Sequence, residues 1–238
     1  LEFLKTLVYQ YLLLTGAAVR DEGLVLRPDD DPSRYEMEDS FTRYYRPARI
    51  RRKKEPRAFR LEGTPFEPFA NNVVAGDMSA SAVHAAARRR GATVTEYLTA
   101  ALIQAIRDSR MDYGFFQARR PVTVSIPVNL RAVFPSRTLR NFFGVANVCV
   151  RLQEDMDFDD ILWAVRQELQ NKSARPRLEE MIAENVRLER NLAVKVVPLF
   201  LKKLILREAF NLRGENCKTI TISNLGRLRL PEDMAAHV

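Results

Sequence analysis

Segments with a helical repeat of apolar residues alternate along this chain with segments in which apolar and polar residues alternate one by one. The strand pattern occurs at Pro121 to Leu130 and at Gly144 to Leu152, and a short final strand is expected at Lys218 to Ser223. Helical repeats precede, separate and follow these strands. Because helices between well-separated strands bury their apolar sides on a sheet, this order predicts an α/β (α+β) protein, a two-layer sandwich with helices on one face of a mixed sheet.

The helical segments begin and end at residues typical of helix caps. Gly16 and Gly91 follow the first and second repeats, where glycine readily takes the left-handed conformation. Thr93 to Glu96 has the capping-box pattern, and Asp157 is placed to cap the next helix. The helices expected from these patterns are Leu1 to Leu12, Asp77 to Arg90, Val94 to Ile106, Phe158 to Leu169, Leu178 to Leu192 and Ala193 to Phe210.

Length and composition indicate a soluble globular chain. Its 238 residues, 46% of them hydrophobic, suffice for a sizeable core. The longest apolar stretch, Val194 to Leu206, is interrupted by Lys195 and Pro198, so it falls short of the roughly 20 residues that span a bilayer. The first residues carry neither a basic leader nor a cleavage site, and Cys149 and Cys217 lie in unrelated contexts. We therefore expect a cytoplasmic protein.

The net charge of +8 lies within one window, Arg43 to Arg60. That window holds nine basic residues against Glu55, whereas the rest of the chain is balanced. Pro47 and Pro56 interrupt it and no helical period runs through it, which favours a solvated linker. Two alternatives are contact with the phosphates of a nucleotide-bearing substrate, and a patch for nucleic acid or an anionic membrane with interleaved aromatic residues. These aromatic residues are Phe41, Tyr44, Tyr45 and Phe59.

Conventional catalytic motifs are scarce in this chain. It contains no GxSxG, GxGxxG or GxxxxGK[ST] pattern, so hydrolase-elbow, dinucleotide and P-loop sites have no support. His84 lies in an alanine-rich helix and His237 near the last residue, and neither has a Ser, Cys or carboxylate at the spacing of a triad or metal site. We expect His84 to be a surface or packing residue. Composition and pattern alone lead no further than a soluble α/β protein.

Three segments carry a resemblance to a known family. SIPVNLR at Ser125 to Arg131 continues through Phe134 to RNFFG at Arg140 to Gly144; TISNLG lies at Thr221 to Gly226; the third segment is Leu1 to Leu7. The first is similar to the "pv(D/N)xR … P … yFGN" region of plant-type acyltransferases and to the "GR … GxFVN" region of peptide-synthetase condensation domains. The second resembles the "SNLG" of the bacterial alcohol-acetyltransferase-like branch. The third resembles the helix that follows the HHxxxDG motif of this superfamily, the CoA-dependent acyltransferases.

The resemblance implies a chloramphenicol-acetyltransferase-like fold of two similar lobes with a tunnel between them. In that family the second histidine of HHxxxDG takes the proton of an acceptor hydroxyl or amine as it attacks a thioester carbonyl. The reaction implies no cofactor or metal, only acyl-CoA or acyl-pantetheine as donor. The motif is expected upstream of Leu1. On this interpretation residues 1–18 are the last helix of an N-terminal lobe, residues 19–65 a basic inter-lobe linker, and residues 66–238 the C-terminal lobe.

Five residues are expected at the substrate site if the resemblance holds. Asn129, Arg131 and Asn141 follow a strand end, where the loops of α/β folds tend to meet ligands. Alternatively, Arg131 is structural and braces the region near the histidine motif through ion pairing. Ser223 and Asn224 end the last strand, where they either donate hydrogen bonds near the acyl carbonyl or form a turn.

Three functions stay open on the sequence. The first is an acyltransferase whose partners are a small-molecule acyl donor, an acceptor with a hydroxyl (an alcohol, a sugar or a glycolipid) or an amine, and the N-terminal lobe. The second is a non-catalytic relative that serves as an interaction domain. The third is a basic-patch binder of nucleic acid or anionic lipid. For the basic patch we expect no binding of nucleic acid, whereas its charge is compatible with peripheral contact with a membrane.

Overall fold

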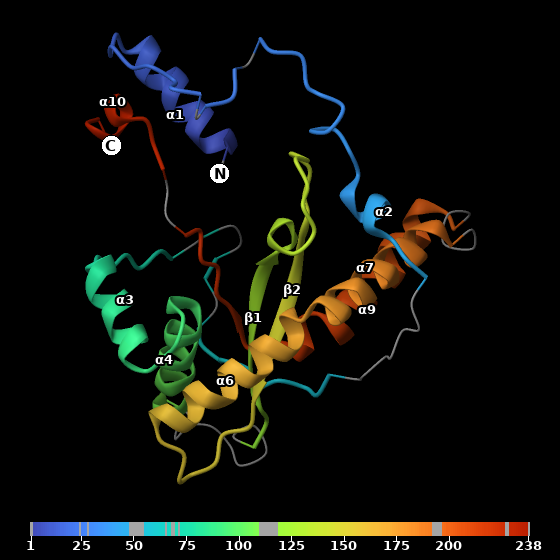
Figure 1. Ribbon diagram of the computed structural model, residues 1–238. Coiled ribbons are helices and arrows are strands. Elements are labelled where there is room, and N and C mark those ends of the chain that lie inside the picture. The colour runs from blue at the N-terminus through green and yellow to red at the C-terminus, as the bar shows by residue number, and fades with distance from the viewer. Residues whose placement is uncertain are drawn as a thin grey trace.

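The chain forms helices around a small sheet, and its first and last helices lie at the same end of the molecule (Figure 1). It is a mixed helix-and-strand protein, as the alternating patterns predict. The computed structural model describes residues 2–23, 25–27, 29–47, 55–64, 66–67, 70, 72–109, 119–191, 197–226 and 229–237.

A three-stranded mixed sheet in the order β2-β1-β3 forms the centre of the fold. The central strand β1 (Val122–Asn129) pairs antiparallel with β2 (Phe143–Val150) and parallel with β3 (Ile220–Thr221). The bounds of β1 and β2 lie within two residues of the predicted ones. The mixed character of the sheet is therefore confirmed.

The third strand is shorter than the predicted Lys218 to Ser223. Its flanks still bond to β1, since the Thr219 N–H donates to the Thr123 carbonyl at 2.7 Å and the Ile222 N–H donates to the Ser125 carbonyl at 3.0 Å. The segment thus runs alongside β1 over most of the predicted length, but only its middle has the full ladder pattern of a strand.

The predicted caps are present. Thr93 and Glu96 exchange two hydrogen bonds at the start of α4 (Val94–Ser109), because the Thr93 N–H donates to the Glu96 carboxylate at 2.8 Å and the Glu96 N–H donates to the Thr93 hydroxyl at 3.2 Å. Asp157 forms the same box at α6 (Phe158–Ser173). Gly91 has a φ of 61°, which an L-residue adopts only with strain, and follows the last turn of the helix before it.

Three helices are shifted from their predicted positions. α3 (Ala80–Arg89) begins later because the Ser79 side chain caps it. α7 (Arg175–Arg190) begins three residues early, since its first turn accepts a proline. α9 (Leu199–Arg213) begins after a proline, and part of the stretch predicted before it, residues 192–196, lies outside the described residues. The other helical elements are α1 (Glu2–Leu14), α2 (Ser40–Tyr44), η2 (Leu130–Ala132), η3 (Glu215–Cys217) and α10 (Glu232–Ala235).

Helices α4 and α6 pack on one face of the sheet. Alternate residues of β1 and β2 point to this face and are at most 4% exposed. The opposite face carries polar residues: Ser125 contacts Asn147 at 2.7 Å, and the Asn147 amide donates to the Glu55 carboxylate at 2.6 Å. The core beneath the helices contains Ile103, Ile106, Val122, Val124, Ile126, Val148, Val150, Ile161, Leu162 and Val165.

A second apolar cluster lies where β1 ends and η2 begins. α2 and α7 pack there on the connection between β1 and β2. Phe41 of α2 contacts Phe142 edge-on, with ring centroids 5.2 Å apart. α7 also lies close over β2, since a Cβ added at Gly144 would come within 2.5 Å of the Met181 Cε. The buried members of this cluster are Leu130, Phe134, Phe142, Leu178, Ile182 and Val186.

The first helix takes part in neither of these clusters. Leu12 of α1 instead packs with Val19, Val25 and Met234 of α10. Figure 1 shows both helices away from the sheet, with the chain returning to α1 after β3. The expectation that α1 lies apart from the sheet core is met, while its assignment to another lobe stays a prediction.

The basic window is packed on the protein at both of its ends. Tyr44 and Tyr45 join the second cluster, and Ala58 and Phe59 are fully buried. The Phe59 N–H donates to the Pro121 carbonyl at 2.8 Å. The aromatic residues considered as nucleic-acid contacts are thus used in packing. Residues 48–54, the centre of the predicted linker, lie outside the described residues, so the solvated-linker interpretation stays a prediction there.

Replacing Phe59 by alanine should lower the free energy of unfolding by about 3–5 kcal/mol, because a fully buried aromatic ring leaves a cavity in the main core. Phe66, which is 62% exposed, is the matched control, and Phe66→Ala should change stability by no more than ~0.5 kcal/mol. Urea denaturation measures both. Equal effects of the two substitutions would mean that the segment around residue 59 is not part of the core.

Candidate functional site

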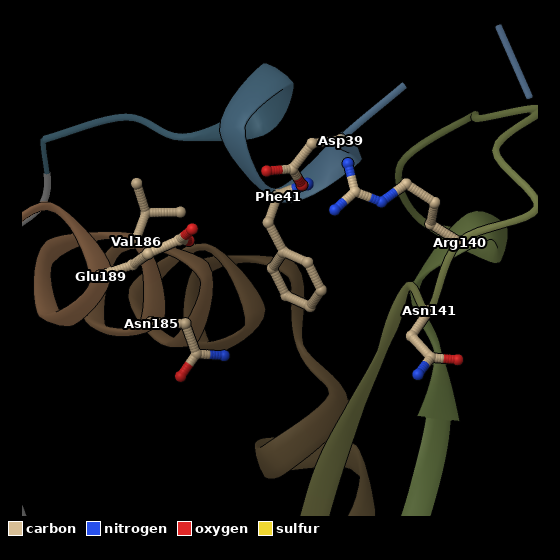
Figure 2. Close-up of a pocket in the computed structure, with 7 residues that line it drawn as sticks. All are labelled: Asp39, Phe41, Arg140, Asn141, Asn185, Val186 and Glu189. Carbon is tan, nitrogen blue, oxygen red and sulfur yellow. The ribbon is translucent and has the colours of Figure 1, made fainter. Parts of the chain in front are cut away.

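A pocket of about 340 Å³ lies between the start of α2, the connection from β1 to β2 and the second half of α7 (Figure 2). Its apolar residues are Phe41 and Val186. Around them stand polar side chains from all three segments, so the pocket has the mixed lining that small-molecule sites share. These polar residues are Asp39, Arg140, Asn141, Asn185 and Glu189.

Asp39 fixes the wall that α2 contributes. Its carboxylate accepts hydrogen bonds from the Phe41 N–H at 3.0 Å and from the Thr42 hydroxyl at 2.7 Å, which caps the helix. Burial acts to raise the pKa of the Asp39 carboxyl. The hydrogen bonds from Thr42 and Phe41 and the charge of Arg140 outweigh it, so the pKa lies below its ordinary value. Figure 2 shows the Arg140 guanidinium turned toward this carboxylate.

Arg131 organises the opposite wall. Its guanidinium donates to the Thr138 carbonyl at 2.7 and 3.2 Å, to the Arg140 carbonyl at 2.7 Å and to the Phe142 carbonyl at 3.5 Å. Asn129 accepts a hydrogen bond from the Arg131 N–H at 3.1 Å and so caps η2. The fork of donors on one arginine therefore holds the turn that precedes β2. These contacts give Arg131 a structural role in the turn, while the ion pairing expected near the histidine motif stays a prediction.

The two walls are joined by hydrogen bonds between distant parts of the chain. The Thr138 hydroxyl donates to the Glu38 carbonyl at 2.6 Å, and the Leu139 N–H donates to the Glu36 carbonyl at 2.9 Å. The Ser40 and Ser136 hydroxyls lie 2.6 Å apart. Since Thr138 and Ser40 are buried, these bonds hold α2 firmly against the connection between β1 and β2.

Several polar groups of the pocket are exposed and have no partner among the residues that the structure describes. Within the described part of the chain, the side-chain amides of Asn141 and Asn185 make no hydrogen bond, and the Glu189 carboxylate makes neither a hydrogen bond nor an ion pair. Figure 2 shows Asn185 and Asn141 on opposite sides of the Phe41 ring. The pocket therefore offers donors and acceptors to a ligand beside an aromatic ring.

The predicted site residues fall into two places. Asn141 lines the pocket, while Asn129 and Arg131 support the turn that carries it. Ser223 and Asn224 follow β3 and are exposed. Of the five predicted residues, Asn141 alone is among the described lining residues of the pocket.

Asn224 makes the contacts of a turn residue. Its amide donates to the Thr95 hydroxyl at 3.1 Å, and its side-chain oxygen accepts from the Gly226 N–H at 2.8 Å. Gly226 has a φ of 71°, a conformation that favours glycine. The turn interpretation of this segment is therefore supported. Because β3 is parallel to β1, the turn still leaves the sheet at the end where Asn129 lies.

Sequence reasoning missed most of the pocket. Asp39 has a recognisable cap pattern before α2, and Asn185 and Glu189 are four residues apart on one face of a helix. Either pattern identifies a helix, but neither tells which loop lies opposite. Phe41 was considered only as part of a nucleic-acid patch. The hydrogen bonds between the α2 segment and residues 136–140 show which loop lies opposite α2.

The remaining reactive residues lie elsewhere. His84 is exposed on α3, as expected of a surface residue, and His237 is exposed near the end of the chain. Burial raises the pKa of the Cys149 thiol, which disfavours the reactive thiolate. Among the residues that the structure describes, no His, Cys, Asp and Glu side chains gather as a metal site, and no helix is long and apolar enough to cross a membrane.

The chain was compared with protein families, curated proteins and solved structures. No family model, no curated protein and no solved structure matches the chain.

Arg131→Lys should lower the free energy of unfolding by about 1–3 kcal/mol, because a lysine cannot serve the carbonyls of Thr138 and Arg140 together. Arg151→Lys is the control at an exposed position. Hydrogen exchange should rise in residues 138–142 of the first variant alone. Unchanged exchange there would show that the turn is held without Arg131.

Proposed function

We propose that this chain is the C-terminal lobe of a cytoplasmic acyltransferase with a chloramphenicol-acetyltransferase-like sandwich fold. It would move an acyl group from a CoA or pantetheine thioester to a hydroxyl or amine. The catalytic histidine would come from the other lobe, and this lobe would supply walls of the substrate tunnel. The acyl donor, the acceptor and the N-terminal lobe are its proposed partners.

The organisation of residues 125–144 is the observation that carries the proposal. SIPVNLR and RNFFG are the most specific segments of the resemblance, and Arg131 holds them together. Its guanidinium donates hydrogen bonds to the carbonyls of Arg140 and Phe142 in the second segment and of Thr138 just before it. The first segment ends β1 and the second begins β2, so both lie at one end of the sheet. TISNLG leaves the sheet at that same end. Loops at the carboxyl end of parallel strands commonly form ligand sites in α/β folds.

The proposed chemistry needs little from this lobe beyond position and polarity. The histidine of the other lobe would take the proton of the acceptor, and the acceptor oxygen or nitrogen would attack the thioester carbonyl. The oxyanion would then collapse, the carbon–sulfur bond would break and the CoA thiolate would take a proton. Polar side chains at the carboxyl end of β1 would orient the acceptor for this attack.

Exposed apolar side chains support an interface with another lobe. Phe200 and Leu204 of α9 are 76% and 58% exposed, and further apolar residues of this helix are exposed beside its lysines and arginine. Exposed apolar side chains that gather on one element often mark a protein–protein contact. α1 has a similar exposed stripe at helical spacing. Its members are Leu4, Leu7, Tyr11 and Leu14.

The chain alone should transfer no acyl group, while the chain extended upstream through an HHxxxDG-bearing lobe should do so. General-base assistance contributes about 10²- to 10⁴-fold, and a single lobe also leaves the thioester open to water. The measurement is release of CoA thiol from acetyl-CoA with a panel of alcohols and amines. The extended protein with its motif histidine changed to alanine is the control.

Two outcomes would contradict the proposal. Acceptor-dependent turnover by the 238-residue chain alone would place the active site within it. An inactive extended protein with an intact motif would favour the non-catalytic interaction domain instead.

Phe200→Ser combined with Leu204→Ser should leave the isolated chain's stability within ~0.5 kcal/mol per substitution, since both side chains are mostly exposed. In the two-lobe protein the same change should cost about 1.5–3 kcal/mol per residue, because burial of the two side chains is lost. Val74→Ser, at a 90% exposed position, is the control. Equal effects on the melting temperature of the two proteins would exclude α9 from the interface.

A further inference from the structure

We propose that the pocket between α2 and α7 binds a neutral polyhydroxylated ligand, a sugar ring or a comparable polyol. This assignment deepens the proposed function by naming the class of acceptor, and only the role of the sugar as acceptor rests on that function. Binding itself follows from the lining of the pocket. Its volume of about 340 Å³ is at the lower end of the range of small-molecule pockets, which suits a ligand of one ring.

The free hydrogen-bonding groups match hydroxyls. The amides of Asn141 and Asn185 each carry a donor and an acceptor that no described residue uses. A hydroxyl also donates and accepts, so one amide can serve two neighbouring hydroxyls of a ring. A ligand without hydroxyls would leave these groups unpaired on desolvation, which costs binding energy.

The charges of the pocket disfavour an ionic ligand. The charge of Arg140 lies beside Asp39, whose carboxylate is already occupied by the cap of α2. Among the described residues, the Arg140 guanidinium and the Glu189 carboxylate form no ion pair, and both side chains are exposed. An anion would meet two carboxylates, whereas an ammonium group would meet the guanidinium on the other side of the pocket. A neutral ligand meets neither penalty.

The apolar surface of the pocket is suited to the carbon-bound hydrogens of a ring. Phe41 is half-buried and is held edge-on by Phe142, so its ring is rigid before a ligand arrives. Val186 lies behind this surface in the α7 wall and is almost fully buried. A pre-organised aromatic ring loses little conformational entropy on binding, which favours a small ligand with few contacts.

The test is a ligand-observed NMR titration of the full chain with methyl β-D-glucopyranoside. Asn141→Ala combined with Asn185→Ala should weaken binding about tenfold or more, the effect of losing at least one hydrogen bond. Asn171→Ala, at an exposed position of α6, should bind like the unchanged protein. Melting temperatures confirm that all variants are folded. Methoxycyclohexane and glucose 6-phosphate should bind more weakly than the glucoside.

Each contrary result overturns the assignment. Absence of glucoside binding at high millimolar concentration, or equal binding by the double variant, would remove the site. Tighter binding of glucosamine that Glu189→Gln abolishes would assign the pocket to a cationic ligand. Because the titration contains no acyl donor and no other lobe, its failure is distinct from an inactive extended protein, and thiol release can succeed where sugar binding fails.

Discussion

The burial of β1 is the constraint on which the rest of the structure depends. Five consecutive residues, Val122 to Ile126, are buried, and both edges of the strand are paired. One face of the sheet packs against α4 and α6. On the other face, the Asn147 amide of β2 donates a hydrogen bond to Glu55 of the basic window. η2 follows β1 directly, and its Arg131 donates a hydrogen bond to the Arg140 carbonyl. The well-ordered strand therefore also fixes the position of the turn that carries Asn141. The pocket is therefore positioned by the sheet, although no strand residue is among its described lining.

Local chemistry made the longer helices and the first two strands predictable, whereas no pattern predicted α2 or α10. The box of Thr93 and Glu96 and the cap at Asp157 each involve residues three apart, so sequence alone contains both partners. Alternation likewise located β1 and β2. β3 was predicted too long, because its length depends on how far β1 can pair with it, and that is a tertiary property. The α/β class follows from local patterns, whereas the proposed sandwich also needs the neighbours of each face.

The pocket depends on contacts that no local pattern contains. Ser40 and Ser136 are 96 residues apart, yet their contact sets which side chains face Arg140. Asn141 was predicted from its place after a strand, while Asn185 and Glu189 became visible only once α7 was placed. The basic window illustrates the same limit, since its prolines and the lack of a helical period suggested a solvated linker, yet Phe59 at one end is buried in the core. Charge alone does not reveal which apolar residue within a basic segment will pack.

The hydroxyl of Thr219 connects two segments made at very different times during translation. It donates to the Phe59 carbonyl, 160 residues earlier, and accepts from the Thr123 N–H, 96 residues earlier. Until the ribosome has released that part of the chain, one edge of β1 is unpaired. Closing loops of this length is slow compared with helix formation, and an unpaired strand edge is prone to associate with other chains. The edge of β1 that faces β3 thus stays open to association with other chains until the segment around Thr219 has been made.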